Sequence, residues 1–587
     1  MAKVKFTVKY RTKKTDKFYR LKNGEYMFEK EIAKNIKIEG MTAADIENMF
    51  ETPKDESMGD VALPCFKLSK VLRKSPAAIA EELKNSFTPC EEVEEVNAVS
   101  GYLNFKISPK AYLKHLIPIV GQGEATGSSD EGRGKTICID YSSVNIAKPF
   151  HIGHLSTTVI GGALYRIFAH LGYRVVGINH LGDWGTQFGK MIVAYLKWGD
   201  RTEVEKGGVL ELNRLYVKFH KEAEENPALD DEARAWFKKI EDGDKQATEL
   251  FLWFKEITLA EVSKVYDRLK IKFDSYAGES FYNDKMQPVL DMLDKKGLLE
   301  VSDGAKVVNL DAYDMPPCLL VKGDGATLYA TRDLAAAYYR AKTYDFYKCL
   351  YVVAYQQNLH FKQLFKVLEL AGFEKAADME HIAFGMVSLE DGAMKTRLGR
   401  VVWLSDVLDK AVEKAKSIIA EKKTEGIDVD KVSEAVGVGA VVFSALWNNR
   451  IKDIVFSFDK VLNFDGETAP YVQYTHARCC SLLKKGGEIN LGDNNLDSIS
   501  NDEGIAVIKS LITFSDSVKK AAQLREPCYV SRHVVDLAEK FNRFYIAHKI
   551  ASAEEGRKNA RLILTLAVKN TIKTGLSLLG IDAPEAM

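Results

Sequence analysis

The sequence lacks a long apolar run. Its longest nearly apolar stretch, Val436 to Trp447, has 12 residues, whereas a helix that crosses a bilayer needs about 20. Residues 1–24 are basic, with nine Lys or Arg and one Asp, but they contain no apolar core of a signal peptide. We therefore expect a buried helix at 436–447 and a chain without a membrane partner.

Cysteine pairs and a surplus of charge are missing too. The eight cysteines form no CxxC pair, and the adjacent Cys479 and Cys480 are too tightly constrained for an ordinary bridge. This pattern favours a reduced, cytoplasmic setting. Because 82 Lys plus Arg balance 82 Asp plus Glu, a polyanionic partner has to be met by local patches and not by a cationic body.

A Walker A loop is also absent, although GRGKT at 132–136 resembles its end. Position 129 is Ser where the loop requires Gly, and the residues after Lys135 read as a strand where the loop requires a helix. The pattern excludes a P-loop nucleotide site. What remains is an ordinary globular composition, 46% hydrophobic and 28% charged, in a chain long enough for about four domains.

Composition and periodicity divide the chain into segments. Residues 1–26 form a basic extension whose place in the natural protein is left open, since Met27 begins a more helical run. The later segments are a small α/β domain at 27–120, a Gly- and Ser-rich linker at 121–134, an α/β domain at 135–404 with a helical insertion at about 197–300, and a helical domain at 405–587.

The α/β domain opens with a strand, a turn, a helix and a strand. Thr136–Tyr141 and Arg174–Asn179 are β-like, and Leu155–Leu171 has helical periodicity, which together predict a parallel βαβ unit. Further strand-like runs occur at 348–354 and 381–387.

The turn of this unit carries the residues most suggestive of chemistry. Backbone N–H groups at the start of a helix attract phosphate, and His151 and His154, three residues apart, can lie on one face of the first turn. Gly153 allows a base or ribose close to the backbone, and Lys148 adds a cation. The same spacing also fits two histidines that only cap a surface helix.

The segment containing HIGH, YSSVNIAKPFHIGHLSTTVIGGALYRIFAHLGYRVVGINHLGDWGTQFGKM at 141–191, resembles class I aminoacyl-tRNA synthetases and specifically the arginyl-tRNA synthetases. The similarity continues in GDGATLYATRDLAAAYYR (323–340), YQQNLHFKQLF (355–365), YVQYTHARCCSLLKK (471–485) and the final LLGIDAPEAM. It spans most of the chain from Met27 onward.

The resemblance implies an α/β fold: a Rossmann-like parallel-sheet catalytic domain with a helical insertion, a small N-terminal α/β domain that grips tRNA, and a C-terminal all-α anticodon-binding bundle. It implies an arginine–tRNA ligase that uses ATP with Mg²⁺ and has to bind tRNA(Arg) before it activates L-arginine. We expect a monomer. Two alternatives stay open: a synthetase for another amino acid, and a non-catalytic RNA-binding relative.

The resemblance also assigns roles to residues. Lys148, His151 and His154 are expected to act on the phosphates together with Lys395 and Arg397 of GAMKTRLG (392–399), a segment that has Ala393 and Thr396 where the KMSKS signature has lysines. Further expected contacts are Gly153, His154, His360 and Met394 for ATP, and Asp140, Ser143, Asn145, Tyr329, Asp333 and Gln357 for arginine.

The helical domain is expected to read tRNA. The predicted tRNA contacts are Tyr471, Gln473, His476, Arg478 and Met587, which interleave aromatic, amide and basic groups. Tyrosines at this spacing also fit a helix core, so Tyr474 is not included. No protein ligand for a metal is predicted.

Overall fold

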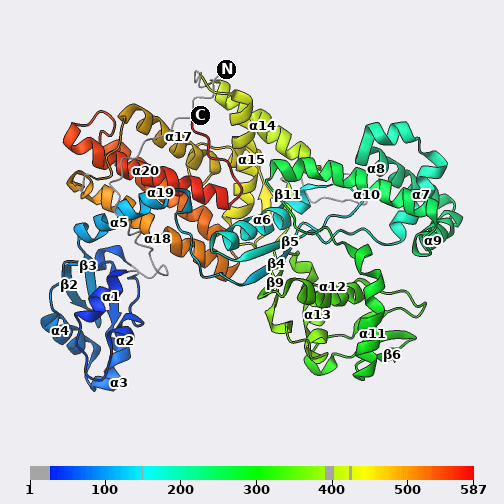
Figure 1. Cartoon of the computed structure of the whole chain (residues 1–587), viewed down its shortest axis with the longest axis horizontal. Helices are drawn as coiled ribbons and strands as arrows, with labels where there is room; N and C mark the ends of the chain where they lie inside the picture. The colour runs from blue at the N-terminus through cyan, green and yellow to red at the C-terminus, as the bar shows by residue number, and fades with distance from the viewer. Residues whose placement is uncertain (1–26, 54, 149, 390–401, 422–425, 493–494) are drawn as a thin grey trace.

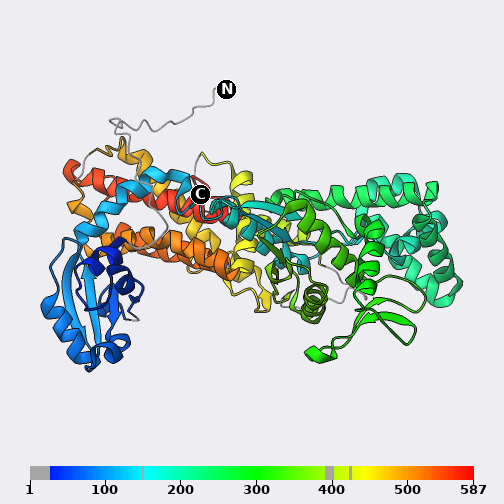
Figure 2. The same cartoon turned by 60° about the horizontal axis from the view of Figure 1, so that its bottom comes forward.

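The computed structural model describes residues 27–587 except 54, 149, 390–401, 422–425 and 493–494. Figures 1 and 2 show a small N-terminal unit at one end of an elongated molecule, a helical insertion at the other end, and a sheet and the C-terminal helices between them. The predicted basic extension, residues 1–26, lies outside the described residues.

The N-terminal unit is a three-stranded antiparallel sheet of order β1-β3-β2, with α4 packed against β2 and β3. Helix α4 begins where the Ser75 side chain accepts a hydrogen bond from Ala78 N and Pro76 takes the first helical position. The elements are α1 (Met27–Lys34), α2 (Ala43–Glu47), β1 (Val61–Pro64), α3 (Ser69–Leu72), α4 (Pro76–Ser86), β2 (Val93–Val99) and β3 (Tyr102–Ile107).

Helix α5 (Pro109–Gln122) leads from this unit to the C-terminal helices and packs against α18 and α20. Side-chain contacts reinforce this connection, because Lys509 pairs with Asp60 and Lys573 pairs with Glu124. The first two residues of the predicted linker, 121–134, belong to α5. The N-terminal unit is therefore attached through α5 to the C-terminal helices.

The central sheet is parallel, with the order β10-β9-β4-β5. Its elements are β4 (Thr136–Asp140), α6 (Leu155–His170), β5 (Arg174–Ile178), α12 (Tyr329–Tyr344), β9 (Lys348–Tyr351), α13 (Asn358–Leu370) and β10 (Met379–His381). The predicted βαβ unit is confirmed. The strand predicted at 381–387 is wrong in extent, because β10 ends at its first residue and β11 (Val387–Leu389) begins at its last.

The order of these strands creates a natural binding position. From β4 the chain proceeds to β5 on one side, whereas from β9 it proceeds to β10 on the other side. In open parallel sheets, ligands bind outside the carboxyl ends of strands where the order reverses in this way. Asp140 and Tyr351, which pair in register, end the two strands that flank this point.

The insertion between β5 and α12 is helical, as predicted, but it also contains a second sheet. Helices α7 and α9 pack together, and α10 crosses α8 (Figure 1). The antiparallel strands β6–β8 were not expected. The elements are α7 (Thr186–Trp198), α8 (Arg201–Glu225), α9 (Ala228–Glu241), α10 (Lys245–Arg268), α11 (Met286–Lys295), β6 (Glu300–Ser302), β7 (Ala305–Val308) and β8 (Cys318–Val321).

The C-terminal part is helical except for β12, which pairs in parallel with β11. Its elements are α14 (Leu404–Glu421), α15 (Val429–Trp447), β12 (Ile454–Phe456), α16 (Phe458–Val461), α17 (Ala469–Gly486), α18 (Asp502–Leu524), α19 (Cys528–Ala547) and α20 (Glu555–Leu578). The apolar run at 436–447 lies in α15 and is largely buried, as expected.

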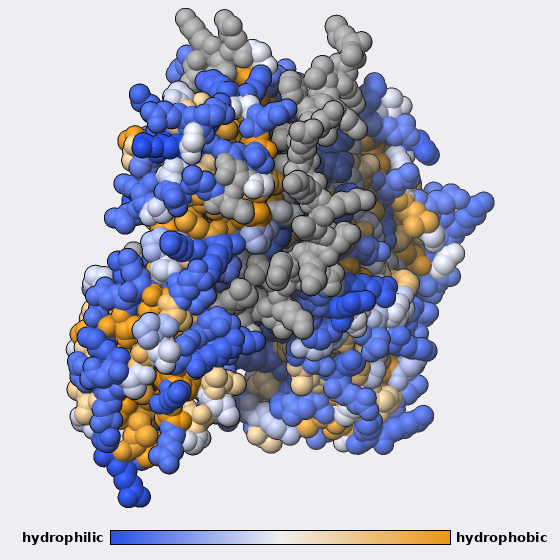
Figure 3. All heavy atoms as spheres, turned by 60° about the vertical axis from the view of Figure 1, so that its left-hand side comes forward, coloured by the Kyte–Doolittle hydropathy of each residue, from blue (hydrophilic) through white to orange (hydrophobic). Residues whose placement is uncertain are grey.

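The state of the cysteines, the apolarity of the helices and the character of one face can be described directly. All eight cysteines are free thiols. None of the helices in the described ranges is long and apolar enough to span a membrane. Hydrophilic residues dominate the face drawn in Figure 3, with apolar residues in scattered groups between them.

Candidate active site

The loop between β4 and α6 carries the HIGH residues in a strained backbone. Ser142, Ser143 and Ala147 have φ angles of 70°, 46° and 59°, a region that residues with a Cβ seldom adopt. The end of the loop is tied to the segment after residue 401, since Ile152 N donates to Val402 O at 3.1 Å and Leu404 N donates to Phe150 O at 2.9 Å. Such strain persists only where surrounding contacts enforce it.

The two histidines use the same ring nitrogen to hold the backbone. Nδ1 of His151 accepts a hydrogen bond from Gly153 N at 3.1 Å, and Nδ1 of His154 accepts one from His151 N at 3.2 Å. A neutral imidazole whose Nδ1 accepts carries its proton on Nε2. Both rings therefore have an Nε2–H donor left for a ligand, and their centroids are 4.0 Å apart.

Both rings are neutral at physiological pH. Burial, with the nearby His151 and Lys148, lowers the pKa of His154 to about 3, and burial and Lys148 lower the pKa of His151. Burial also lowers the pKa of Lys148. The shared effect of Lys148 on both histidines shows that the three predicted phosphate-binding groups are close together. Each histidine can donate one hydrogen bond to a phosphate oxygen without carrying a charge.

The negative charge of Asp140, at the end of β4, is balanced by a cation within the protein. Its Oδ2 pairs with Nη2 of the buried Arg340 at 2.7 Å, and its Oδ1 accepts from Ser143 Oγ at 3.0 Å. Arg340 also lies 3.4 Å from Nδ1 of His180. Asn145 is exposed and forms a parallel bridge with Gly182. The structure thus brings Asp140 and Ser143 together at the carboxyl end of β4, with Asn145 two residues further along the same loop.

Asp333 is the acceptor of a second cluster. Its Oδ2 is 2.8 Å from His360 Nε2, and its Oδ1 is 3.7 Å from His180 Nε2. Burial alone disfavours the carboxylate, but the hydrogen bond from His360 and the nearby His180 hold the pKa of Asp333 below its usual value. The Tyr329 ring, on a side chain 55% exposed, packs edge-on against His360 at 4.7 Å. His360, expected to contact ATP, therefore lies with the residues expected to contact arginine.

Gln357 lies one helical turn before His360. It is exposed and ends the short 3₁₀ turn Tyr355–Gln357 that precedes α13. Its neighbour Tyr355 is linked to Phe384 by a backbone hydrogen bond of 3.0 Å. The 3₁₀ turn and the first turn of α13 thus place Gln357 and His360 close together along the chain.

Sequence reasoning missed three residues of this site, which are His180, Glu279 and Arg340. His180 joins the two clusters, because it contacts both Arg340 and Asp333. Burial raises the pKa of Glu279 to about 7, partly offset by Arg332, with Asp333 also acting on it. His180 and Arg340 both lie in segments that resemble the family, at 141–191 and 323–340. Only their tertiary contacts distinguish them from ordinary core or surface residues.

Comparisons with known proteins identify the family of this chain. The pattern of the catalytic domain of class I (R) tRNA synthetases matches residues 118–458, that of the DALR anticodon binding domain matches 472–587, and that of the arginyl tRNA synthetase N terminal domain matches 27–107. The chain belongs to the arginyl-tRNA synthetase family.

Similar full-length proteins support this membership. The arginine–tRNA ligase of Clostridioides difficile (strain 630) is 50% identical over 94% of this chain and 98% of its own length, and that of Alkaliphilus metalliredigens (strain QYMF) is 51% identical over 94% and 97%. The structure of Thermus thermophilus arginyl-tRNA synthetase superimposes with a TM-score of 0.78 at 27% identity, covering 92% of this chain and 96% of that one.

The predicted counterpart of the second synthetase signature is the segment at 392–399. Met394, Lys395 and Arg397 lie outside the described residues. The chain on either side is described: β11 contacts the HIGH turn, and Trp403 forms an antiparallel bridge with His151. Both flanks of this synthetase segment therefore adjoin the HIGH histidines.

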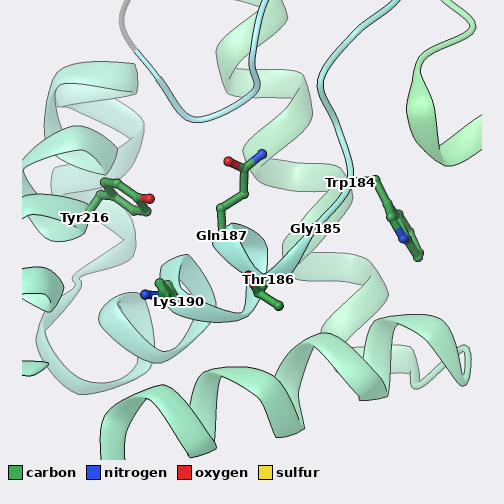
Figure 4. Close-up of a pocket in the computed structure, with 6 residues that line it drawn as sticks. All are labelled: Trp184, Gly185, Thr186, Gln187, Lys190 and Tyr216. Carbon is green, nitrogen blue, oxygen red and sulfur yellow. The ribbon is translucent and has the colours of Figure 1, made fainter. Parts of the chain in front are cut away.

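A polar cavity of about 300 Å³ lies within the insertion, between the start of α7 and α8. Its lining residues are Trp184, Gly185, Thr186, Gln187, Lys190 and Tyr216 (Figure 4). In Figure 4 the Gln187 amide rises from the start of α7 between Tyr216 and Trp184. Asp183, next to this segment, is fully buried and bonded to Lys255 and Ser280. Asp183 therefore stabilises the junction between the insertion and the sheet.

Two predicted tRNA contacts need correction. Gln473 is fully buried, and its amide donates to Ala435 O at 2.9 Å and to Asp582 O at 2.8 Å. His476 is 1% exposed, and its Nδ1 lies 2.9 Å from Pro584 O. Both side chains hold the C-terminal segment, so they have no free surface for tRNA.

The other predicted contacts surround a different surface of the synthetase. Arg478 bonds Asn542 and lies over the rings of Tyr474 and Tyr545, 5.1 and 4.6 Å from their centroids. Tyr474 and Tyr545 are each 38% exposed. Helices α17 and α19 thus present an exposed aromatic–guanidinium surface that only the fold assembles.

The two remaining predicted residues make different contacts. Tyr471 OH accepts from Asn542 Nδ2 at 3.0 Å, and Met587 packs on the small core that includes Ile419 and Val436.

Proposed function

We propose that this chain is an arginine–tRNA ligase that converts L-arginine and ATP to arginyl-adenylate and pyrophosphate, then transfers the arginyl group to the 3′ end of tRNA(Arg). The observation that carries this proposal is the pairing, at one switch point, of two Nε2–H donors with the partly buried carboxylate of Asp333 and its histidine partners. The donors suit a phosphate chain, and the carboxylate suits a guanidinium.

In the first step, a carboxylate oxygen of arginine attacks the α-phosphorus, and the bond from that phosphorus to the bridging oxygen of pyrophosphate breaks. Little covalent work falls to the protein beyond positioning and charge stabilisation. We assign His151 and His154 to the phosphate oxygens through Nε2–H, with Lys148, Lys395 and Arg397 supplying positive charge. Gly153 and Met394 are assigned to ATP.

For arginine, we assign the guanidinium to Asp333 with Tyr329 and Gln357, and the α-amino and α-carboxylate end to Asp140, Ser143 and Asn145. His360 supports Asp333 in this arrangement through its 2.8 Å contact. In the second step, a hydroxyl of the terminal ribose attacks the arginyl carbonyl carbon, and AMP leaves.

Mg²⁺ is proposed to arrive on the oxygens of ATP, where it neutralises phosphate charge. Within the described ranges, no group of three or more His, Cys, Asp or Glu side chains could hold a metal ion. The proposal, like the sequence-based expectation, assigns Mg²⁺ no protein ligands.

The remaining assignments follow the family. We propose that tRNA has to bind before arginine is activated, that residues 27–120 and 405–587 contact tRNA on either side of a catalytic unit at 135–404, and that the enzyme acts as a cytoplasmic monomer. The exposed surface of Arg478, Tyr474 and Tyr545 supports the anticodon side of this proposal.

ATP–pyrophosphate exchange with each amino acid, with and without tRNA(Arg), tests the proposal. We expect exchange with arginine alone among the amino acids, and only when tRNA is present. Exchange with another amino acid in place of arginine would refute the substrate, and tRNA binding without any exchange would indicate a non-catalytic relative.

A further inference from the structure

The HIGH loop is held in its strained shape by helix α10 of the insertion. Tyr266 and Thr258 are eight residues apart on α10, so they lie on one face, about 12 Å apart along the axis. Tyr266 OH contacts Ser142 Oγ at 2.8 Å, and Thr258 Oγ1 accepts from Ala147 N at 3.0 Å. Ser142 and Ala147 are the first and last left-handed residues of the loop. One helix therefore restrains both strained ends.

The hydroxyl of Tyr266 belongs to a hydrogen-bonded chain that ends on the HIGH backbone. The successive contacts are Asn179 Nδ2 to Tyr266 OH (3.0 Å), Tyr266 OH to Ser142 Oγ (2.8 Å), Ser142 Oγ to Thr158 Oγ1 (2.9 Å), and Thr158 Oγ1 to the carbonyl oxygen of His154 (2.7 Å). All four side chains are at most 3% exposed. Water has little access to replace any link.

The direction of this chain is determined from its last member. A carbonyl oxygen only accepts, so Thr158 donates to it, and Ser142 has to donate to Thr158. Tyr266 then donates to Ser142, and Asn179 donates to Tyr266. Every hydroxyl gives one hydrogen bond and receives one. Asn179 Oδ1, at the start of the chain, is buried without a partner, which is consistent with an amide oriented by its donor side.

The Tyr266 ring provides a second connection to the same histidine. It packs edge-on against Phe150 at 5.5 Å, and Phe150 stacks on His154 at 5.1 Å with an interplanar angle of 25°. The backbone of His154 is therefore fixed through the hydroxyl, and its imidazole plane is fixed through the ring.

We propose that Tyr266 is a positioning residue for adenylate formation: it orients His154, and through it His151, toward the phosphates of ATP. Thr258 supports the same loop beside Lys148. The inference rests on the proposed function, because it assumes that these histidines act on ATP. It gives the helical insertion a task within the ATP site, in addition to any contact with tRNA.

The test is single-turnover adenylate formation by the full chain with saturating ATP, arginine and tRNA, normalised to the burst amplitude. Tyr266→Phe keeps the ring and removes only the hydroxyl. We expect it to lower the rate constant by about 10- to 10²-fold, as small misplacements of catalytic groups do, with unchanged amplitude and unchanged Kd for tRNA. The control Tyr276→Phe removes a hydroxyl from a side chain 43% exposed in the next segment and should react like the wild type.

A double-mutant cycle shows whether Tyr266 acts through His154. In a His154→Ala background, Tyr266→Phe should change the rate by less than about threefold, because coupled residues are not additive. At the second contact, Thr258→Val should slow the reaction, and Thr258→Ser, which keeps the hydroxyl, should restore it.

Three results would overturn the proposal: a wild-type rate in Tyr266→Phe, a loss confined to burst amplitude, or the full loss repeated in the His154→Ala background. If the wild type itself gave no exchange dependent on arginine, the proposed function would fail instead.

Discussion

The partly buried histidines of the HIGH turn and the buried His476 in α17 are all neutral, but their rings are used in opposite ways. Burial lowers the pKa of His476 to about 4, as it lowers that of His154 to about 3. In the HIGH turn, Nδ1 accepts from the backbone and Nε2–H remains as a donor. In α17, Nδ1 faces the carbonyl of Pro584, which only accepts, so the donor of His476 is already occupied by the chain itself.

The difference shows that residue type and motif do not define a binding group. Both segments carry histidine with amide, hydroxyl or basic neighbours, and both suggest contact with a phosphate-rich ligand. The HIGH turn and α17 differ in whether the polar side-chain atoms already form hydrogen bonds within the protein. Gln473, whose amide nitrogen binds two carbonyl oxygens, belongs with His476, whereas Arg478 lies over two exposed rings and is the group that we propose for tRNA.

The largest expected effect comes from removing the side chain of His154. His154→Ala should slow adenylate formation by about 10²- to 10³-fold, because a donor to the transition state is lost, and should leave the Kd for tRNA within about twofold. ATP–pyrophosphate exchange and filter binding measure the two effects.

His476→Ala is the matched variant. At saturating tRNA its exchange rate should stay within a few-fold of the wild type. If both variants lost exchange equally, the contrast between the two segments would be wrong.

A smaller effect is expected at the arginine end of the site. Asp333→Asn removes the charge that balances a guanidinium, so kcat/KM for arginine should fall by about 10- to 10²-fold, the range of a charge-assisted hydrogen bond, while KM for ATP changes little. Asp324→Asn, at an exposed loop acid that caps Ala326 N, is the control. An unchanged kcat/KM for arginine in Asp333→Asn would contradict the assignment of Asp333 to the site.

In the helical domain the partly exposed Arg478 should contribute to tRNA binding, and the buried Gln473 and His476 should not contact tRNA. Arg478→Met should weaken tRNA binding by about tenfold, since stacking of one base on such a surface contributes about 1–3 kcal/mol. Arg532→Met, on the neighbouring helix α19, should have little effect. Equal affinities of the two variants, measured by filter binding, would contradict the surface.

The smallest expected effect is a pH dependence. The pKa of Glu279 is raised to about 7, so its carboxylate is mostly present at pH 8 and mostly protonated at pH 6. Because the arginine side chain stays cationic throughout, kcat/KM for arginine should fall several-fold as the pH drops from 8 to 6. Glu279→Gln should flatten this profile between pH 6 and 8, and a profile equally steep in that variant would assign the titration to another group.

Much of the fold was predictable because it follows local patterns. The βαβ unit at 136–179, the buried helix at 436–447 and the helical C-terminal part depend on periodicity, which short segments carry themselves. Strands β6–β8 and the break between β10 and β11 were missed, since strands of three or four residues contain too few residues to show a period. The HIGH residues were identifiable because their chemistry lies within four consecutive positions.

The roles of His180, Arg340, Tyr266 and Gln473 were decided only by the tertiary structure. Each contacts a partner from a distant part of the chain, such as Arg340 with Asp140 or Gln473 with Asp582. Local sequence specifies which donors and acceptors a segment carries, and the family resemblance identifies the reaction. Whether a given donor is consumed within the protein or left free for a ligand depends on which remote group occupies the space beside it, and only packing settles that.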